Sequence, residues 1–200
     1  MNIDIIKEKA LNEHIPIIMD DTLDVIKDIL IKEQPTKILE IGTATGYSAI
    51  CFATILLENC RGELRSPIKI DTIELDEQRA NEAVENIKQM NLERNINVLK
   101  GNAVEILPTL KGAYDIVFID AAKGKYPIFL KEAIRLSHKD TMILADNILY
   151  KGYVMSDYNK HKQRTAVTHL REYIKLVNEN PNLETEILEV GDGLAISRVK

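Results

Sequence analysis

The chain has 200 residues, of which 45% are hydrophobic and 28% are charged, and its formal net charge is -5. This composition is typical of one globular domain, and the acidic balance argues against a dedicated nucleic-acid binder or a basic protein of the membrane surface. No apolar run approaches 18 residues, which argues against a transmembrane helix, and with only two cysteines we expect a cytoplasmic protein with reduced thiols.

Residues 1–34 come before the first predicted strand, and we expect them to form two helices. Pro16 separates these helices and Pro35 ends the second, because the residue before a proline is disfavoured in helical backbone. We expect residues 35–200 to form the core of a single domain that spans residues 1–200.

Short apolar runs and helical patterns then alternate along the chain. The runs are rich in Ile and Val and are apolar on both faces, which is typical of parallel strands covered by helices on both sides. The predicted strands are 37–41, 68–75, 95–101, 114–120 and 141–147. The predicted helices between them are 45–59, 77–91, 103–111 and 126–137.

The end of the chain departs from this alternation. A predicted helix at 160–179 leads to two further strands, 184–190 and 194–199, which a Gly-Asp-Gly turn joins. Two strands joined by a glycine-rich turn predict an antiparallel hairpin. The predicted fold is therefore α/β, with five parallel strands and a C-terminal antiparallel hairpin, seven strands in all.

A turn with two glycines, Gly42 and Gly46, joins the first predicted strand to the helix after it. Such a turn lets backbone N–H groups and a helix N-terminus meet an anionic group of a ligand. The middle glycine of a G-x-G-x-x-G motif and the lysine of a P-loop are both missing, so a dinucleotide or a nucleoside triphosphate is disfavoured. The alternative is a plain strand–helix turn that needs glycine for its backbone angles.

Glu74 stands at the end of the second predicted strand and favours a ligand at this turn. In open α/β sheets an acid at this place commonly accepts hydrogen bonds from the two ribose hydroxyls. Together with the glycine turn it predicts an adenosine-containing cofactor. Asn102 and Ala103 follow the third strand, where they would meet the adenine edge, although asparagine is also a favoured N-cap. Asp76 suits the N-cap of the following helix.

Asp120 ends the fourth predicted strand, and Asp146 and Asn147 end the fifth. Two carboxylates and an amide oxygen, with no sulfur or imidazole, suit Mg²⁺ or a similar cation. The alternatives are a helix cap for Asp120 and a turn for Asp146 and Asn147. Lys123 follows closely, and because a nearby cation favours the neutral form of a lysine, it is a candidate general base. The alternative is a solvated surface lysine.

Four motifs in this order, EIGTATGYS, IELD, FIDAAKGKY and ADN, carry a resemblance to a known family. The chain resembles the class I S-adenosylmethionine-dependent methyltransferases, which have a Rossmann-like fold, and among them the cation-dependent catechol-type O-methyltransferases. Its last part, with DNILYKGYV, DYNK and EVGDGLAIS, is similar to the bacterial enzymes that convert wobble-position 5-hydroxyuridine of tRNA to 5-methoxyuridine.

The resemblance implies roles for individual residues, with S-adenosylmethionine as cofactor and Mg²⁺ or a similar divalent cation as metal. The implied catalytic residues are Lys123 and Asp120, and the implied metal ligands are Asp120, Asp146 and Asn147. The implied cofactor-binding residues are Ile18, Glu40, Gly42, Ser48, Glu74, Asn102, Ala103 and Asp120. It also implies a possible homodimer.

The expected reaction is methylation of 5-hydroxyuridine in the tRNA anticodon region. Residues 150–171 support an RNA contact, because they hold five basic residues against one acid and include tyrosines that can stack on an unpaired base. The residues expected to contact RNA are Lys151, Lys160, Lys162 and Arg164. One alternative is methylation of a small catechol or phenol, with these charges on a solvated helix face. Another is an inert module that binds adenosine or RNA.

Overall fold

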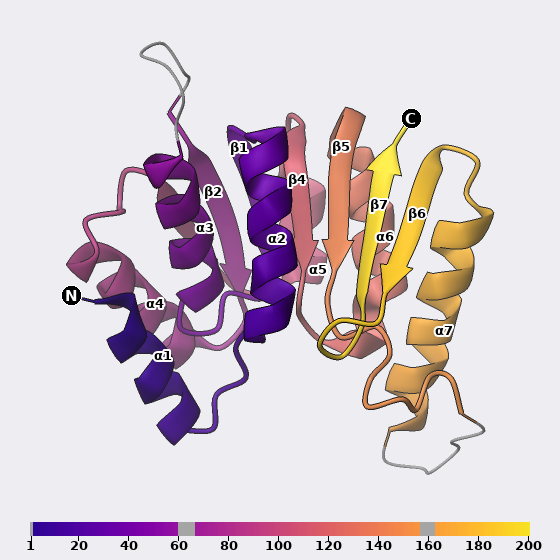
Figure 1. The fold of residues 1–200 in the computed structure, drawn as a ribbon, viewed down its shortest axis with the longest axis horizontal. Coiled ribbons are helices and arrows are strands. Elements are labelled where there is room, and N and C mark those ends of the chain that lie inside the picture. Colours follow the sequence, from indigo (N-terminus) through magenta and orange to yellow (C-terminus); the bar gives the residue numbers. More distant parts are fainter. Residues whose placement is uncertain (1, 60–66, 157–162) are drawn as a thin grey trace. The chain divides into compact units, whose positions relative to one another are not determined.

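The computed structural model describes residues 2–59, 67–156 and 163–200, and these fall into two compact units, 1–106 and 107–200 (Figure 1). The first unit contains five helices and three strands among its described residues. They are α1 (Ile3–Asn12), α2 (Asp20–Glu33), β1 (Lys37–Ile41), α3 (Tyr47–Glu58), β2 (Lys69–Glu74), α4 (Glu77–Gln89), β3 (Ile96–Lys100) and α5 (Ala103–Ile106). The pairs β1–β2 and β2–β3 are both parallel.

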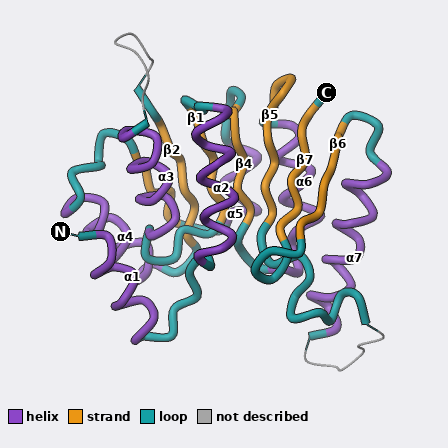
Figure 2. The backbone as a smooth tube through the Cα atoms, in the orientation of Figure 1, coloured by secondary structure: helices purple, strands orange, loops and turns teal. Residues whose placement is uncertain are grey.

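The second unit carries the remaining four strands, in the spatial order β4-β5-β7-β6 (Figure 2). Its elements are β4 (Tyr114–Ile119), α6 (Tyr126–Arg135), β5 (Ser137–Ala145), α7 (Arg164–Glu179), β6 (Leu183–Leu188) and β7 (Leu194–Val199), with short 3₁₀ helices at Leu107–Thr109 and Lys123–Lys125. β4 and β5 are parallel, whereas β7 runs antiparallel to both β5 and β6.

The mostly parallel seven-stranded sheet with a C-terminal antiparallel hairpin confirms the predicted fold class. β1 is buried as its apolar run predicts, with Ile38, Leu39 and Ile41 fully buried. The edge strands β3 and β6 are only partly buried. No helix among the described residues is long and apolar enough to span a bilayer. The single-domain organisation stays a prediction.

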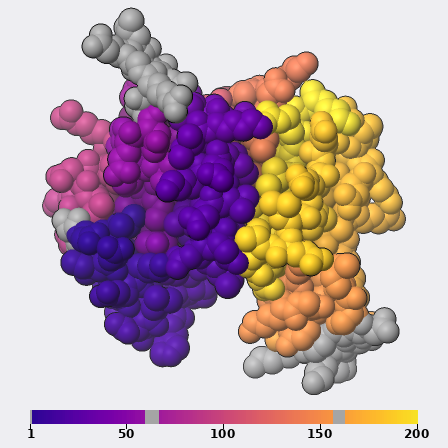
Figure 3. Space-filling view, in the orientation of Figure 1, coloured from indigo at the N-terminus to yellow at the C-terminus, as the bar shows by residue number. Residues whose placement is uncertain are grey.

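Helix ends in the first unit follow from local sequence. Gln34 ends α2 in the left-handed conformation, directly before Pro35. Asp76 begins α4 as its N-cap, where its carboxylate accepts a hydrogen bond from the Arg79 amide (2.9 Å). α1 lies at the surface of this unit (indigo, Figure 3) and exposes Ile5 and Leu11.

The start of β5 differs most from the prediction. β5 begins at Ser137, a residue predicted to lie in the helix 126–137. Ser137 pairs with Tyr114 of β4, and the register then shifts. Thr141 secures this irregular stretch, because its hydroxyl donates to the Tyr114 carbonyl (2.7 Å) and accepts from the His138 amide (2.9 Å). Polar, mostly exposed residues occupy this stretch, so no apolar pattern in the sequence indicates a strand there.

The turn of the C-terminal hairpin supports the segment that follows β5. The amides of Ile148 and Leu149 donate to the carbonyls of Gly193 (3.0 Å) and Asp192 (2.9 Å). The Lys151 amide donates to the Asp192 carboxylate (2.5 Å). Three hydrogen bonds therefore hold the chain after Asn147 against residues far away in the sequence.

Replacing Gly193 by alanine is expected to destabilise the protein by about 2–5 kcal/mol. Gly193 has φ +89°, and an added Cβ would lie 2.4 Å from Leu149 Cγ. Gly152→Ala is the matched control: its φ is +73°, but nothing among the described residues lies within 4 Å of the added Cβ. We expect the control to lose only about 1 kcal/mol. Urea unfolding of both variants measures the difference, and equal losses would contradict the steric argument.

Candidate active site

The glycine turn after β1 is fixed against β2 by backbone hydrogen bonds. The amides of Gly42 and Thr43 both donate to the Ile73 carbonyl, at 3.0 and 3.2 Å. Gly46 precedes α3 with φ +85°, and an added Cβ would lie 3.3 Å from Ala83 Cβ. Glycine is therefore required here both by the backbone angle and by the close approach of α4. The turn presents the N-terminus of α3, whose first N–H groups have no partner within the helix.

A buried polar network lies beneath this turn, centred on Glu40. Glu40 is fully buried, and its two carboxylate oxygens accept hydrogen bonds from the hydroxyls of Ser48 and Thr72, each at 2.5 Å. The hydroxyls of Thr72 and Thr43 are also 2.5 Å apart. Glu40 thus joins strand, turn and helix, and its part in shaping a cofactor loop stays a prediction. The Ser48 hydroxyl is engaged by Glu40.

Sequence reasoning missed Thr43 and Thr72. Threonine is common in strands and turns, so neither residue looked unusual by itself. One signal was present: Thr72 is a hydroxyl residue inside an apolar strand, on the neighbour of the strand that carries the buried Glu40. Two polar residues on adjacent buried strands predict a hydrogen bond between them.

Glu74 reaches the glycine turn, as its predicted role requires. It is 9% exposed at the end of β2, and its carboxylate accepts hydrogen bonds from the amides of Ala44 (2.8 Å) and Asp76 (2.9 Å). These amides fix the carboxylate beside the turn and leave it acceptor capacity for further donors. The structure thus brings Glu74 against the glycine turn, the two features that together predict an adenosine-containing cofactor.

Asn102 and Ala103 lie close by, at the end of β3. The Gly101 amide donates to the Glu74 carbonyl (2.7 Å), which places the start of α5 beside the end of β2. The Asn102 side chain accepts from the Val104 amide (3.0 Å) and donates to Glu105 (3.1 Å). Asn102 therefore acts as the N-cap named as its alternative, and an adenine contact stays a prediction. Ile18 is buried just before α2, and its cofactor contact likewise stays a prediction.

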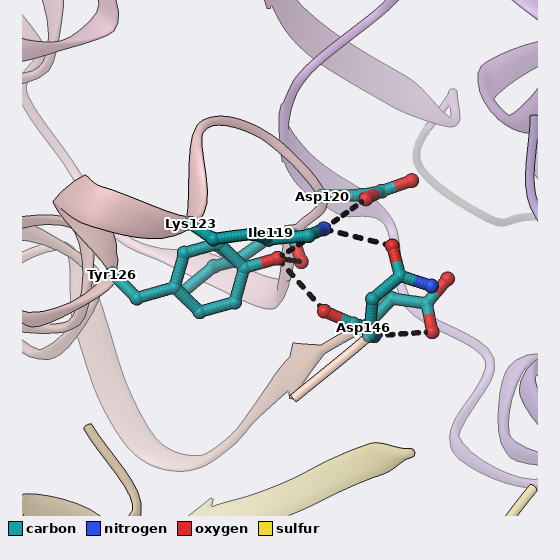
Figure 4. Close-up of polar contacts among 6 residues, drawn as sticks. Ile119, Asp120, Lys123, Tyr126 and Asp146 are labelled. Carbon is teal, nitrogen blue, oxygen red and sulfur yellow. Dashed lines mark hydrogen bonds and ion pairs between the residues drawn. The ribbon is translucent and has the colours of Figure 1, made fainter. Parts of the chain in front are cut away.

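In the second unit Lys123 donates hydrogen bonds to oxygen atoms of two predicted metal ligands, Asp120 and Asn147 (Figure 4). Its Nζ donates to Asp120 Oδ1 (2.9 Å), to Asn147 Oδ1 (2.7 Å) and to the Tyr126 hydroxyl (2.9 Å). The Lys123 side chain is only 15% exposed. Lys123 is thus a largely buried member of the cluster, so the solvated surface lysine of the alternative interpretation is wrong.

Asp146 lies beside this cluster and is almost completely buried. One carboxylate oxygen, Oδ1, accepts from the Asn147 amide (2.7 Å). The other, Oδ2, is buried and has no hydrogen-bond partner in the part of the chain that the structure describes. Burial, together with the negative charge of Asp120, raises the pKa of Asp146 to about 7. Asn147 itself adopts the left-handed conformation, with φ 56°.

These residues fit a divalent cation. A buried carboxylate oxygen without a partner is costly, and a bound cation would satisfy the one left on Asp146. The oxygen-only set of Asp120, Asp146 and Asn147 suits a hard ion. The described residues include no group of three or more His, Cys, Asp or Glu that could hold a metal. A cation here would therefore depend on the amide oxygen of Asn147 as well as on the two carboxylates.

Tyr126, the first residue of α6, was missed as a member of this site. Its hydroxyl donates to the Asp146 carbonyl (2.8 Å) and accepts from Lys123. Burial raises the pKa of the phenol well above its ordinary value, so the hydroxyl stays protonated. The available signal was its position three residues after Lys123, at the start of the predicted helix 126–137. The structure extends helical backbone to Lys123 through the 3₁₀ helix Lys123–Lys125, where side chains three residues apart are neighbours.

The predicted RNA-contact residues are only partly described. Lys151 and Arg164 are exposed, whereas Lys160 and Lys162 lie outside the described residues. Arg171 contributed to the charge excess of this segment, yet its guanidinium donates to the backbone carbonyls of Tyr153, Val154 and Ser156. Arg171, which is not among the predicted RNA-contact residues, therefore fastens the segment 153–156 to α7.

The sequence as a whole matches a known family. Residues 18–200 match the sequence model of the O-methyltransferase family. A catechol O-methyltransferase of Niastella koreensis is 34% identical and is covered over 75% of its length by 84% of this chain. A catechol O-methyltransferase of Mycobacterium tuberculosis is 31% identical, with 73% of its length covered by 84% of this chain.

Solved structures agree with the sequence match. The structure of a provisionally named caffeoyl-CoA O-methyltransferase of Staphylococcus aureus superposes with a TM-score of 0.89 at 31% identity, over all of this chain and 93% of that one. An O-methyltransferase of Bacillus cereus in complex with SAH gives a TM-score of 0.86 at 25% identity, over 99% of this chain and 90% of that one.

Proposed function

The chain belongs to the O-methyltransferase family, and we propose that its acceptor is a small aromatic compound with hydroxyl groups on neighbouring ring carbons. It is an S-adenosylmethionine-dependent O-methyltransferase. The observation that carries the proposal is the set of oxygens around Lys123, with the unpartnered carboxylate oxygen of Asp146 beside it. Such a set suits an acceptor that offers two adjacent oxygens.

Each group has a distinct part in the proposed reaction. Glu74 would accept hydrogen bonds from the ribose hydroxyls, and the glycine turn would hold the methionine end of the cofactor. Asp120, Asp146 and Asn147 would hold a divalent cation, which when bound lowers the pKa of the acceptor hydroxyl and orients it. Lys123 would receive the hydroxyl proton. The oxygen then forms a bond to the methyl carbon as the bond from that carbon to sulfur breaks, and the neutral thioether leaves.

The electrostatics of this transfer favour a buried site. The sulfonium is positively charged and the deprotonated oxygen is negatively charged, so the reaction cancels charge and is favoured where water is excluded. Asp146 is buried and Lys123 is largely buried, so water has little access to this cluster. Holding both reactants in place supplies much of the remaining acceleration. The names of the relatives, catechol O-methyltransferases among them, support the choice of a small aromatic acceptor.

A second candidate acceptor is 5-hydroxyuridine at the wobble position of tRNA. Its O5 and O4 are also neighbouring oxygens, so the same cluster would serve. The observation in its favour is an exposed lysine, Lys151, between Tyr150 and Tyr153, whose rings meet edge to face at 6.0 Å. Aromatic and cationic groups together suit an unpaired base and its phosphates. The tRNA partner, the homodimer and a cytoplasmic location stay predictions.

One experiment separates the two acceptors. The protein is incubated with Mg²⁺ and methyl-labelled S-adenosylmethionine, with either catechol or tRNA that carries unmethylated 5-hydroxyuridine, and the products are identified by mass spectrometry. We expect methylated catechol, and we expect EDTA to abolish it. Transfer to tRNA alone, weakened by rising salt, would replace the first proposal with the second. Transfer to neither acceptor would contradict both.

A further inference from the structure

We propose that Tyr126 is a positioning residue that holds Lys123 for proton transfer, an inference that rests on the proposed function. The Tyr126 hydroxyl lies 2.9 Å from Lys123 Nζ, and Lys123 Nζ lies 5.2 Å from the centre of the Tyr126 ring (Figure 4). Among the described residues, the Tyr126 hydroxyl makes no hydrogen bond to the carboxylate of Asp120 or of Asp146. Its effect on the reaction would therefore pass through Lys123.

The hydrogen bonds of Tyr126 fix the direction of its hydroxyl. The single proton is donated to the Asp146 carbonyl at 2.8 Å, with the Ile119 carbonyl farther away at 3.3 Å. Toward Lys123 the hydroxyl can then only accept, so it requires an N–H group of Lys123 to point at it. Once protonated, Lys123 has three N–H groups, for which Asp120, Asn147 and Tyr126 provide three acceptors. The neutral amine that would receive the hydroxyl proton has only two N–H groups, so one of the three contacts is absent before the transfer.

Tyr126 is held rigidly enough to serve as a reference point. Its side chain is fully buried, and its ring meets that of Tyr173 on α7 edge to face, with centroids 5.6 Å apart. The carbonyls that its hydroxyl contacts belong to Ile119 and Asp146, at the ends of β4 and β5. Asp120 directly follows Ile119, and Asn147 directly follows Asp146. The Tyr126 hydroxyl therefore contacts the peptide carbonyl just before each of these two predicted metal ligands.

The contact with Tyr126 differs from the other two contacts of Lys123 in one respect. Asp120 and Asn147 are proposed metal ligands, so their oxygens are needed elsewhere when the site is loaded. The Tyr126 oxygen is not, and its bond to Lys123 can persist throughout the reaction. A lysine that loses this bond keeps its packing but not its orientation, and misplacing a reacting group costs rate more than binding.

Tyr126→Phe tests the inference, with Tyr173→Phe as the matched control. Both changes remove one hydroxyl from a buried, edge-to-face ring pair, but the Tyr173 hydroxyl has no hydrogen-bond partner among the described residues. We expect Tyr126→Phe to lower kcat roughly 10- to 100-fold with an unchanged KM for S-adenosylmethionine. Tyr173→Phe should keep the wild-type kcat. An unchanged kcat in Tyr126→Phe would overturn the inference.

A double-mutant cycle shows whether Tyr126 acts through Lys123. Lys123→Met alone should lower kcat by roughly 100-fold or more. If Tyr126 acts through Lys123, adding Tyr126→Phe to this variant should cost nothing further. Additive losses, together with a parallel fall in melting temperature, would instead indicate that Tyr126 only supports the fold, and would overturn the inference.

The inference and the proposed function fail in different ways. If the wild type methylates no acceptor, or if Lys123→Met keeps full activity, the proposed function fails. A crystal structure of Tyr126→Phe then still decides whether the hydroxyl positions Lys123. Displacement of Lys123 Nζ from Asp120 and Asn147 supports the positioning role, and unchanged contacts overturn it.

Discussion

Replacing Asp146 by asparagine is expected to lower kcat/KM for methyl transfer by at least roughly 100-fold without destabilising the metal-free protein. Loss of an outer partner of a metal ligand already costs roughly 10- to 100-fold, and Asp146 is a proposed ligand itself. Asparagine keeps an oxygen that can accept the hydrogen bond from the Asn147 amide. It removes the negative charge of the carboxylate, whose other oxygen is buried and has no hydrogen-bond partner among the described residues. Burial and the charge of Asp120 already disfavour the ionised form of Asp146, so a neutral amide in its place should not destabilise the metal-free protein.

The experiment combines initial rates over a range of Mg²⁺ concentrations with thermal unfolding of the metal-free protein. Asp140→Asn is the matched control, because Asp140 is an exposed residue of the same strand, β5. It undergoes the same chemical change, and we expect wild-type rates and an unchanged melting temperature. Full activity of Asp146→Asn that is insensitive to EDTA would show that no metal role belongs to this residue.

Replacing Glu74 by alanine is expected to weaken binding of S-adenosylmethionine roughly 100-fold. A hydrogen bond to a charged group contributes about 1.5–3 kcal/mol, and the proposed carboxylate accepts from two ribose hydroxyls. The amides of Ala44 and Asp76 hold this carboxylate in place, so its loss also frees the turn that would hold the other end of the cofactor. Titration calorimetry with S-adenosylmethionine measures the loss directly.

Asp76→Ala is the control for Glu74, because the two acids are two residues apart and only one is the proposed ribose ligand. Asp76 caps α4 through the Arg79 amide, so its replacement should cost about 1 kcal/mol of stability. Its affinity for the cofactor should stay that of the wild type. If Glu74→Ala bound S-adenosylmethionine as tightly as the wild type, Glu74 would serve only to fasten the glycine turn to β2.

The sequence predicted the site residues that contrast with their surroundings. Glu74, Asp120 and Asp146 are visible because each is an acid at the end of an apolar strand. The parallel pairing of β4 with β5 brings together the two strand ends that carry Asp120 and Asp146. Thr72 and Tyr126 contrast far less with their surroundings, because threonine is an ordinary strand residue and tyrosine an ordinary core residue. Their roles depend on which atom their hydroxyl meets, and spacing along the chain does not encode that.

Counting charges along the chain was similarly limited. The sequence predicts Lys123 as a general base, with a solvated surface lysine as the alternative, and Arg171 adds to the basic excess of residues 150–171. In the structure the first is enclosed by three oxygens of its own cluster, and the second binds backbone carbonyls of its own chain. The sign of a side chain is readable from sequence, but the groups that contact it depend on tertiary packing.

The contact between the hairpin turn and the segment after Asn147 has an evolutionary consequence. The backbone of residues 148–151 is held by Asp192 and Gly193, and Leu149 occupies the space that a side chain at position 193 would need. A change in one of these two stretches disturbs its contacts with the other. We therefore expect insertions and substitutions in the two stretches to occur together during evolution. A lineage with a changed sequence at residues 148–151 should therefore also differ at residues 192 and 193.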